Sequence, residues 1–165
     1  MNGVVLAGLL VAAAFCDWRR RKIPDWLTLP LIAAGLWQQW QAGSAWTAWG
    51  GVAGAFLLTV GPVACRGMGM GDQKLLMAVG AWSSWTEVYL LFTSAILLCL
   101  LSIALLPRAW SRLRYNLQKI AIGWSAHRQL WLPGKGEAAI SFPFAVFLLG
   151  AYGIRQLSPL AGVAA

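Results

Sequence analysis

Six continuous apolar runs follow one another along the chain, and short polar or glycine-rich breaks separate them. Apolar residues in these runs are contiguous instead of alternating with polar ones, so each run predicts a helix and not a strand of a membrane barrel. The expected helices span about residues 2–16, 26–41, 46–64, 73–82, 88–106 and 137–156. The pattern indicates an all-α integral membrane protein with about six transmembrane helices in a single domain, residues 1–165.

Proline and glycine predict where the early helices end and how they pack. Pro24 disfavours helix at Ile23, and Asp25 follows it as the expected N-cap of the second helix. In the third run, residues 50–55 place small side chains at helical spacing. Such a surface favours close packing against another helix in lipid.

A basic segment, residues 108–136, lies between the last two runs and holds six of the 13 Lys and Arg residues. Its apolar residues recur at steps of three and four, which is typical of an amphipathic helix on a membrane surface. They are Trp110, Leu113, Leu117, Ile120 and Trp124. A solvated basic loop explains the segment equally well, so both interpretations stay open. His127, the single histidine, lies here among polar residues, where a catalytic or metal-binding role is not expected.

Composition places the chain in a membrane and excludes other classes of protein. Hydrophobic residues make up 59% of the chain, charged residues only 11%, and the mean hydropathy is +0.66. Soluble domains carry about 25% charged residues. The net charge of +8 could indicate nucleic-acid binding, but the positive residues lie in the breaks, as they do in membrane proteins. The three cysteines form no C-x-x-C pair, so neither a zinc site nor a disulfide framework is expected.

The distribution of basic residues predicts the orientation in the membrane. With six helices and the N-terminus outside, three breaks face the cytoplasm, at residues 17–25, 65–74 and 108–135. All but one of the 13 basic residues lie in these breaks. Basic residues accumulate in cytoplasmic loops, so this distribution supports the orientation. It also places Asp17 and Asp72 on the same side of the membrane, each at a helix end.

One acidic residue lies in a glycine-rich motif at the start of an apolar run. Asp72 follows glycines at positions 67, 69 and 71, which permit positive φ angles and the close approach of another chain segment. An acid at the edge of the hydrocarbon region is costly and indicates a functional site. The alternative is a plain turn whose aspartate caps the next helix. Asp17 and Asp25 are the candidate partners of Asp72, because the two glutamates lie in expected turns.

Two carboxylates at one site would form an acid–base pair. Like charges a few ångströms apart cannot both ionise at neutral pH, so the pair holds one proton. The ionised carboxylate can activate a water while the protonated one donates to a peptide carbonyl. This is the chemistry of an aspartic protease, and it requires no metal or organic cofactor. Intramembrane acids also serve proton or cation transport, so a small transporter or a non-proteolytic membrane subunit stays open as the alternative.

Two stretches and a short late motif resemble a known family. Residues 17–31 and residues 67–82 are similar to the catalytic core of type IV prepilin peptidases, and residues 141–144 resemble the proline-containing motif of their final helix. Members of this family are membrane aspartic proteases of the G-x-G-D type. The resemblance implies that Asp17 and Asp72 are the catalytic pair. It further implies catalytic-loop roles for Gly69, Gly71 and Lys74, and structural roles near the site for Pro24, Asp25 and Pro143.

The resemblance also implies a substrate and a location. Family members cut the leader peptide of type IV prepilins or pseudopilins at the cytoplasmic face of the bacterial inner membrane. The expected partners are such a substrate and membrane lipid, with no nucleic acid. The chain lacks the paired C-x-x-C motifs of the methyltransferase domain of bifunctional members, so it is similar to the stand-alone peptidases of tight-adherence (Flp-type) pili. Gln73 replaces the aromatic or apolar residue more usual at its position, a departure expected to affect fine specificity.

A topology reporter tests the predicted orientation. Fused after Lys119, the reporter should be cytoplasmic, because the basic segment is retained on the side where positive charge accumulates. The same reporter fused after Gly43 should be extracytoplasmic and serves as the control. A reporter after Lys119 that proves extracytoplasmic would remove the argument that Asp17 and Asp72 share one face.

Overall fold

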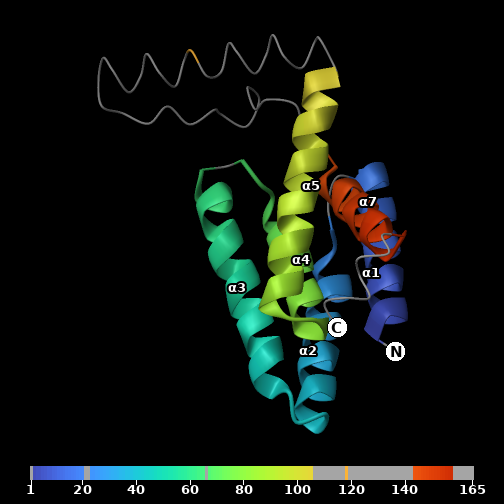
Figure 1. The fold of residues 1–165 in the computed structure, drawn as a ribbon, viewed down its shortest axis with the longest axis vertical. Helices are drawn as coiled ribbons and strands as arrows, with labels where there is room; N and C mark the ends of the chain where they lie inside the picture. The colour runs from blue at the N-terminus through green and yellow to red at the C-terminus, as the bar shows by residue number, and fades with distance from the viewer. Residues whose placement is uncertain (1, 21–22, 66, 106–117, 119–142, 158–165) are drawn as a thin grey trace. The chain divides into compact units, whose positions relative to one another are not determined.

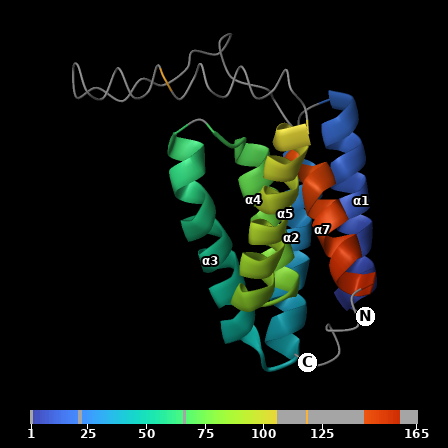
Figure 2. The ribbon, with the colours of Figure 1, turned by 45° about the horizontal axis from the view of Figure 1, so that its top comes forward.

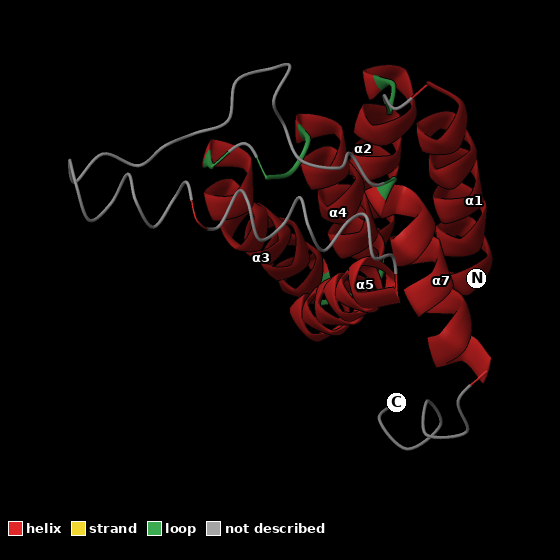
Figure 3. Ribbon diagram, turned by 90° about the horizontal axis from the view of Figure 1, so that it is seen from above, coloured by secondary structure: helices red, strands yellow, loops and turns green. Residues whose placement is uncertain are grey.

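The computed structural model describes residues 2–20, 23–65, 67–105, 118 and 143–157. These residues form α-helices joined by short turns, and no strand is present among them (Figures 1 and 3). The prediction of an all-helical fold is confirmed. The helices are α1 (Asn2–Arg20), α2 (Asp25–Gln41), α3 (Ala45–Ala64), α4 (Met70–Trp82), α5 (Trp85–Leu105) and α7 (Phe144–Leu157).

The chain divides into two compact units, and the first one contains the helix packing described below as well as the candidate site. The first unit comprises Met1–Ile96 together with Pro143–Ala165, and the second comprises Leu97–Phe142. The basic segment 108–136 belongs to the second unit and, apart from residue 118, lies outside the described residues. Its two interpretations, a surface helix and a solvated loop, therefore remain predictions.

Two helix boundaries differ from the sequence prediction in ways that affect the acidic residues. The first helix continues to Arg20 instead of ending at about residue 16, so Asp17 lies inside its last turns. Basic residues at a helix C-terminus interact favourably with the helix dipole, which is a reason for the helix to continue through them. The fourth helix begins at Met70 instead of residue 73, so Asp72 lies in its first turn and not in a loop.

Two helices, α3 and α5, are long and apolar enough to cross a membrane. α7 is also apolar but has 14 residues, and α4 has only 13. At a rise of about 1.5 Å per residue, helices of that length are shorter than a hydrocarbon core of roughly 30 Å. The structure thus supports a helical membrane protein, while six complete transmembrane passages remain a proposal.

Helix α4 is the centre of the first unit. It packs most extensively against α3 and next against α2, with smaller contacts to α1 and α7 (Figures 1 and 2). Five of its side chains are completely buried, and they are Leu75, Leu76, Ala78, Val79 and Ala81. The short helix that begins with Asp72 is therefore held on several sides by its neighbours.

Glycines allow α3 and α4 to touch backbone to backbone. A Cβ added to Gly51 would overlap the carbonyl group of Gly80, and a Cβ added to Gly80 would overlap Gly51. A second close approach joins α2 to α4, where a Cβ on Gly35 would collide with Trp82. The Trp82 indole N–H donates a hydrogen bond to the Leu31 carbonyl of α2, at 2.8 Å. The predicted role of the small residues in 50–55 as a packing surface is confirmed at Gly51.

Helices α1 and α7 form a second pair in the same unit (Figure 2). The Tyr152 hydroxyl donates a hydrogen bond to the Gly3 carbonyl at 2.9 Å, which ties the end of α7 to the start of α1. Helix α5 contacts this pair through the rings of Phe92 and Phe144, whose centroids lie 6.1 Å apart. The first unit therefore contains two helix groups, α2–α3–α4 and α1–α7, with a smaller contact between α1 and α4.

The α3–α4 contact predicts different effects for two adjacent glycines. Gly51→Ala should destabilise the protein by about 1–3 kcal/mol, because the added methyl group meets backbone that cannot rotate away. Gly50→Ala is the matched control, since nothing lies within 4 Å of a Cβ at that position. The control should be neutral or slightly stabilising, because alanine favours helix over glycine. Thermal unfolding of both variants in detergent measures the difference, and equal melting temperatures would contradict the packing argument.

Candidate active site

Asp17 lies in α1 and points its carboxylate at the start of α7. It is buried, with 8% of its surface exposed, and its Oδ2 accepts a hydrogen bond from the Ala145 backbone N–H at 3.2 Å. Ala145 belongs to the first turn of α7, whose N–H groups have no partner within the helix. Such a helix N-terminus stabilises negative charge on a bound group. The end of α7 therefore holds the Asp17 carboxylate in place.

Pro143 stands immediately before this turn, and its expected structural role near the site stays a prediction. It has no N–H of its own, and its carbonyl accepts the first bond of the helix from Val146 N–H at 3.1 Å. A fixed φ angle and a missing donor suit proline to the start of a helix. Pro143 thus defines where α7 begins and which N–H group faces Asp17.

Asp72 lies in the first turn of α4, three residues after the N-cap residue Gly69. The Gly69 carbonyl accepts hydrogen bonds from Asp72 N–H at 3.1 Å and from Gln73 N–H at 3.3 Å. The Asp72 carboxyl group in turn interacts with the Gly69 backbone N–H. This reciprocal arrangement resembles a capping box, in which the third residue of a helix reaches back to its N-cap. The alternative interpretation, in which Asp72 caps the helix, is therefore partly confirmed, because Asp72 contacts the backbone of the N-cap residue.

Helix capping does not explain the raised pKa of Asp72. Burial raises the pKa of its carboxyl group, and the negative charge of Asp17 raises it further, from 3.8 to about 7. The Gly69 backbone hydrogen bond acts in the opposite direction but does not compensate. Asp72 lies outside the candidate membrane spans α3 and α5. The structure thus brings Asp17 close enough to Asp72 for its charge to add to the effect of burial on the pKa of Asp72.

The glycines before Asp72 serve close packing and not an unusual backbone conformation. Among the described residues, a positive φ angle occurs at Gly43 and not at the glycines of this motif. A Cβ on Gly69 would lie 3.3 Å from Asp72 Oδ2, and a Cβ on Gly71 would lie 3.3 Å from the Ile23 Cβ. Both distances are tighter than ordinary contacts. The expectation of positive φ was wrong here, whereas the expectation of close approach is confirmed.

Asp25 does not cap α2 as expected. The N-cap is Pro24, in an extended conformation, and no side chain caps this helix. Asp25 is the first helical residue, and its Oδ1 instead forms an ion pair with Lys74 Nζ at 2.8 Å. The ion pair is partly exposed, with 59% of the Asp25 side chain and 30% of the Lys74 side chain accessible. It joins the start of α2 to the second turn of α4.

Side-chain patterns could not reveal all the groups around the two carboxylates. The Ala145 N–H and the Ile23 contact involve a backbone donor and an ordinary apolar residue, neither of which is recognisable in a sequence. Pro143 was the available signal for the first, since it marks a helix start. Within the described ranges, no group of three or more His, Cys, Asp or Glu side chains lies together, so these residues offer no evident metal site.

A second ion pair lies far from the two aspartates. Arg155 Nη2 of α7 and Glu87 Oε1 of α5 are 2.6 Å apart. Glu87 follows the C-terminal end of α4, whereas Asp72 lies at its N-terminal end. The two ends of α4 thus carry different charged groups, an aspartate pair at one end and a glutamate–arginine pair near the other.

Comparison with known proteins identifies relatives of this region. Over 97 aligned residues, the chain is 37% identical to the prepilin leader peptidase/N-methyltransferase of Aeromonas hydrophila. The alignment covers 52% of this chain and 32% of that protein. The protein of the same description from Klebsiella pneumoniae is also 37% identical over 97 residues, covering 52% and 41% of the two chains. The one from Neisseria gonorrhoeae is 32% identical over 110 residues, covering 59% and 37%.

The chain spans about a third to two-fifths of the length of these relatives. No solved structure matches the chain significantly. The model of the type IV leader peptidase family matches residues 4–104, a range that contains Asp17, Asp25, Asp72 and Lys74. Because this match covers more than half of the chain, the protein belongs to the type IV leader peptidase family.

Proposed function

We propose that this protein is a membrane aspartic endopeptidase that removes the leader peptide from type IV prepilins or pseudopilins during pilus assembly. The observation that carries the proposal is that Asp72 is buried beside the negative charge of Asp17, and burial together with that charge raises the pKa of Asp72 to about 7. Both residues lie within the region matched by the family model. The names of the relatives, which include prepilin leader peptidase, supply the class of substrate.

The geometry favours a division of roles between the two carboxylates. Asp17 accepts an N–H from the start of α7, which suits it to the ionised state, and Asp72 keeps a proton near neutral pH because its pKa is raised. Ionised Asp17 would take a proton from a water, whose oxygen attacks the scissile carbonyl carbon. Asp72 would donate its proton to the carbonyl oxygen. Collapse of the tetrahedral intermediate then breaks the C–N bond, and the leaving amine takes a proton from the pair.

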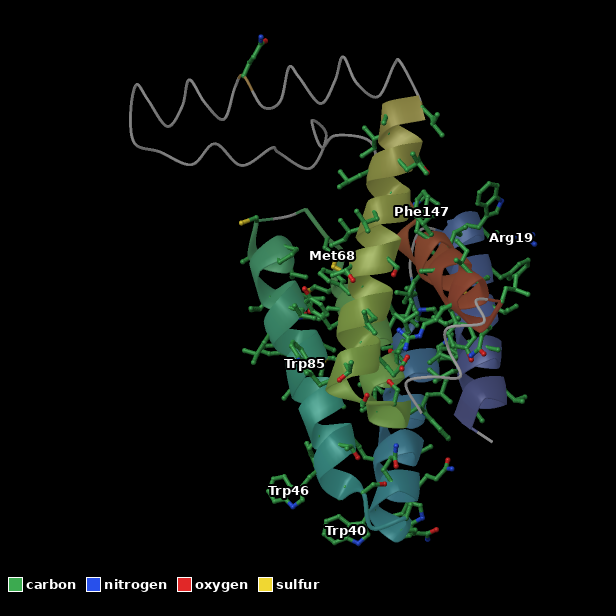
Figure 4. The ribbon with its side chains drawn as sticks, viewed as in Figure 1. Arg19, Trp40, Trp46, Met68, Trp85 and Phe147 are labelled. Atoms are coloured by element: carbon green, nitrogen blue, oxygen red, sulfur yellow. The ribbon has the colours of Figure 1, made fainter. Side chains whose placement is uncertain are left out.

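We further propose that the protein is a multi-pass inner-membrane protein with the aspartate pair at its cytoplasmic face. Exposed tryptophans support this placement, because aromatic side chains gather at membrane interfaces. Trp40 and Trp46 are exposed where α2 passes into α3, and Arg19 lies toward the opposite end (Figure 4). Trp18 and Trp26 are exposed at the junction of α1 and α2, close in sequence to Asp17 and to the basic residues there.

A transporter or a non-proteolytic subunit is not favoured. Ion and proton sites of transporters lie near the bilayer midplane, commonly at broken helices. Asp17 lies in the last turns of α1, and Asp72 lies in the first turn of α4. Carboxylates at helix ends suit a site that an extended substrate reaches from the membrane surface.

Substitution of the two aspartates tests the proposed catalytic pair. Asp17→Asn and Asp72→Asn should each reduce leader cleavage by at least about a thousandfold, because an amide cannot exchange the proton that activates water. The double variant should be hardly worse than either single one, as expected for residues that act as a unit. Leader cleavage of a candidate prepilin by equal amounts of purified protein measures these effects.

Glu87→Gln is the control for this experiment. Glu87 is another acid of the first unit, but it forms an ion pair with Arg155, away from Asp17 and Asp72. The control variant should cleave at close to the parent rate. An active Asp17→Asn together with an inactive Asp25→Asn would mean that Asp25, and not Asp17, is the partner of Asp72.

The raised pKa of Asp72 predicts the pH dependence of cleavage. Below about pH 7 Asp72 holds the proton that it donates, and above this value the proton is lost. We therefore expect kcat/KM to fall about tenfold per pH unit once the pH exceeds about 7, since kcat/KM reports ionisation of the free enzyme. Cleavage measured between pH 5 and pH 9 in detergent tests this. A constant kcat/KM up to pH 9 would show that Asp72 is not the proton donor.

A further inference from the structure

We propose that the ion pair between Asp25 and Lys74 is a positioning device that holds Asp72 at its working distance from Asp17. The inference rests on the proposed function, because the distance matters for a catalytic pair. In this interpretation Asp25 and Lys74 are positioning residues, and neither contacts the reacting atoms. The two joined elements are the start of α2 and the second turn of α4.

The need for such a device follows from how the helices pack. Asp17 belongs to α1, which packs mainly on α7, whereas Asp72 belongs to α4, which packs mainly on α3 and α2. The direct contact between α1 and α4 is much smaller than either of these. The two carboxylates therefore lie on different helix groups, and their mutual repulsion acts to separate them.

The chain segment after α1 contacts α4 on both sides of Asp72. Ile23 packs against Gly71, where a Cβ would lie only 3.3 Å from the Ile23 Cβ. Asp25 reaches Lys74, two residues after Asp72, at 2.8 Å. Since only a few residues separate Asp17 from these contacts, the segment ties the end of α1 directly to the turn that carries Asp72. The apolar contact sets how closely the segments approach, and the ion pair prevents them from sliding apart.

Apart from the ion pair itself, the described residues of the helices that pack on α4 carry few charged groups, which makes the effect of the ion pair separable from other effects. Helix α3 contains no ionisable group, and Asp25 is the ionisable residue of α2. Helix α4 contributes Asp72 and Lys74, and the charged residue of α7, Arg155, pairs with Glu87 near the other end of α4. From α1, Asp17 is the group whose charge acts on Asp72. Partly exposed ion pairs contribute little to folding, so removing this one should leave the protein folded.

A double-mutant cycle tests the proposal. Asp25→Asn, Lys74→Gln and the double variant should each lower kcat about tenfold with little change in KM, because a small misplacement of catalytic groups slows the chemical step. The losses should be equal and not additive, since each variant breaks the same ion pair. Additive losses, or a raised KM in Lys74→Gln, would overturn the proposal and indicate that Lys74 acts independently on the substrate.

The matched control is the double variant Glu87→Gln with Arg155→Gln, which removes an ion pair of similar exposure in the same unit. It should lower the melting temperature by a similar small amount and leave kcat unchanged. The charge-exchanged protein, Asp25→Lys with Lys74→Asp, should recover kcat relative to Asp25→Lys alone. If the exchanged protein is no faster than that single variant, the ion pair does not act by positioning.

A measurement without substrate separates this proposal from the proposed function. The double variant Asp25→Asn with Lys74→Gln removes one charge of each sign, so its net charge is unchanged. If the carboxylates move apart, repulsion from Asp17 weakens, and Asp72 should titrate at a lower pH than in the parent, as followed by carboxyl ¹³C NMR of labelled aspartate. An unchanged titration would overturn the positioning proposal. If the titration shifts in the double variant but the parent protein cleaves no prepilin, only the proposed function is rejected.

Discussion

Mutual repulsion between Asp17 and Asp72 is the constraint on which the arrangement of this protein depends. Burial of Asp72 and, after it, the negative charge of Asp17 raise the pKa of the Asp72 carboxyl group to about 7, so the two carboxylates are not both ionised at neutral pH. Each carboxylate is therefore held by a backbone N–H at the start of a helix, Asp17 by Ala145 and Asp72 by Gly69. These donors hold the two carboxylates in place against their mutual repulsion.

Helix α4 can carry one of these carboxylates because its own position is firmly determined. The backbone contact between Gly51 and Gly80 and the hydrogen bond from Trp82 to α2 attach its C-terminal half to α3 and α2. Close contacts of this kind replace the hydrophobic driving force that lipid does not provide. The N-terminal turn with Asp72 begins a helix that is closely packed on α3 and α2 and has a smaller contact with α1.

The start of α7 brings the last described part of the sequence to the first helix. Pro143 sets the first turn, Phe144 packs on Phe92 of α5, and Ala145 donates to Asp17. A residue pair separated by 128 positions is thereby joined at the site. A proline far from both aspartates in the sequence thus lies shortly before the residue that donates to Asp17.

The sequence alone determined the helical class, the packing surface in α3 and the two stretches that contain the candidate aspartates. These features are local, because they depend on runs of apolar residues, on glycine spacing and on short motifs. Helix ends were less predictable, since α1 continues through Asp17 and α4 begins at Met70, inside the glycine-rich motif. Only the tertiary structure decided that Asp25 pairs with Lys74 instead of capping α2, and that a backbone N–H of α7 binds Asp17. Both contacts depend on which helices lie side by side, and a backbone donor is the same in every residue except proline.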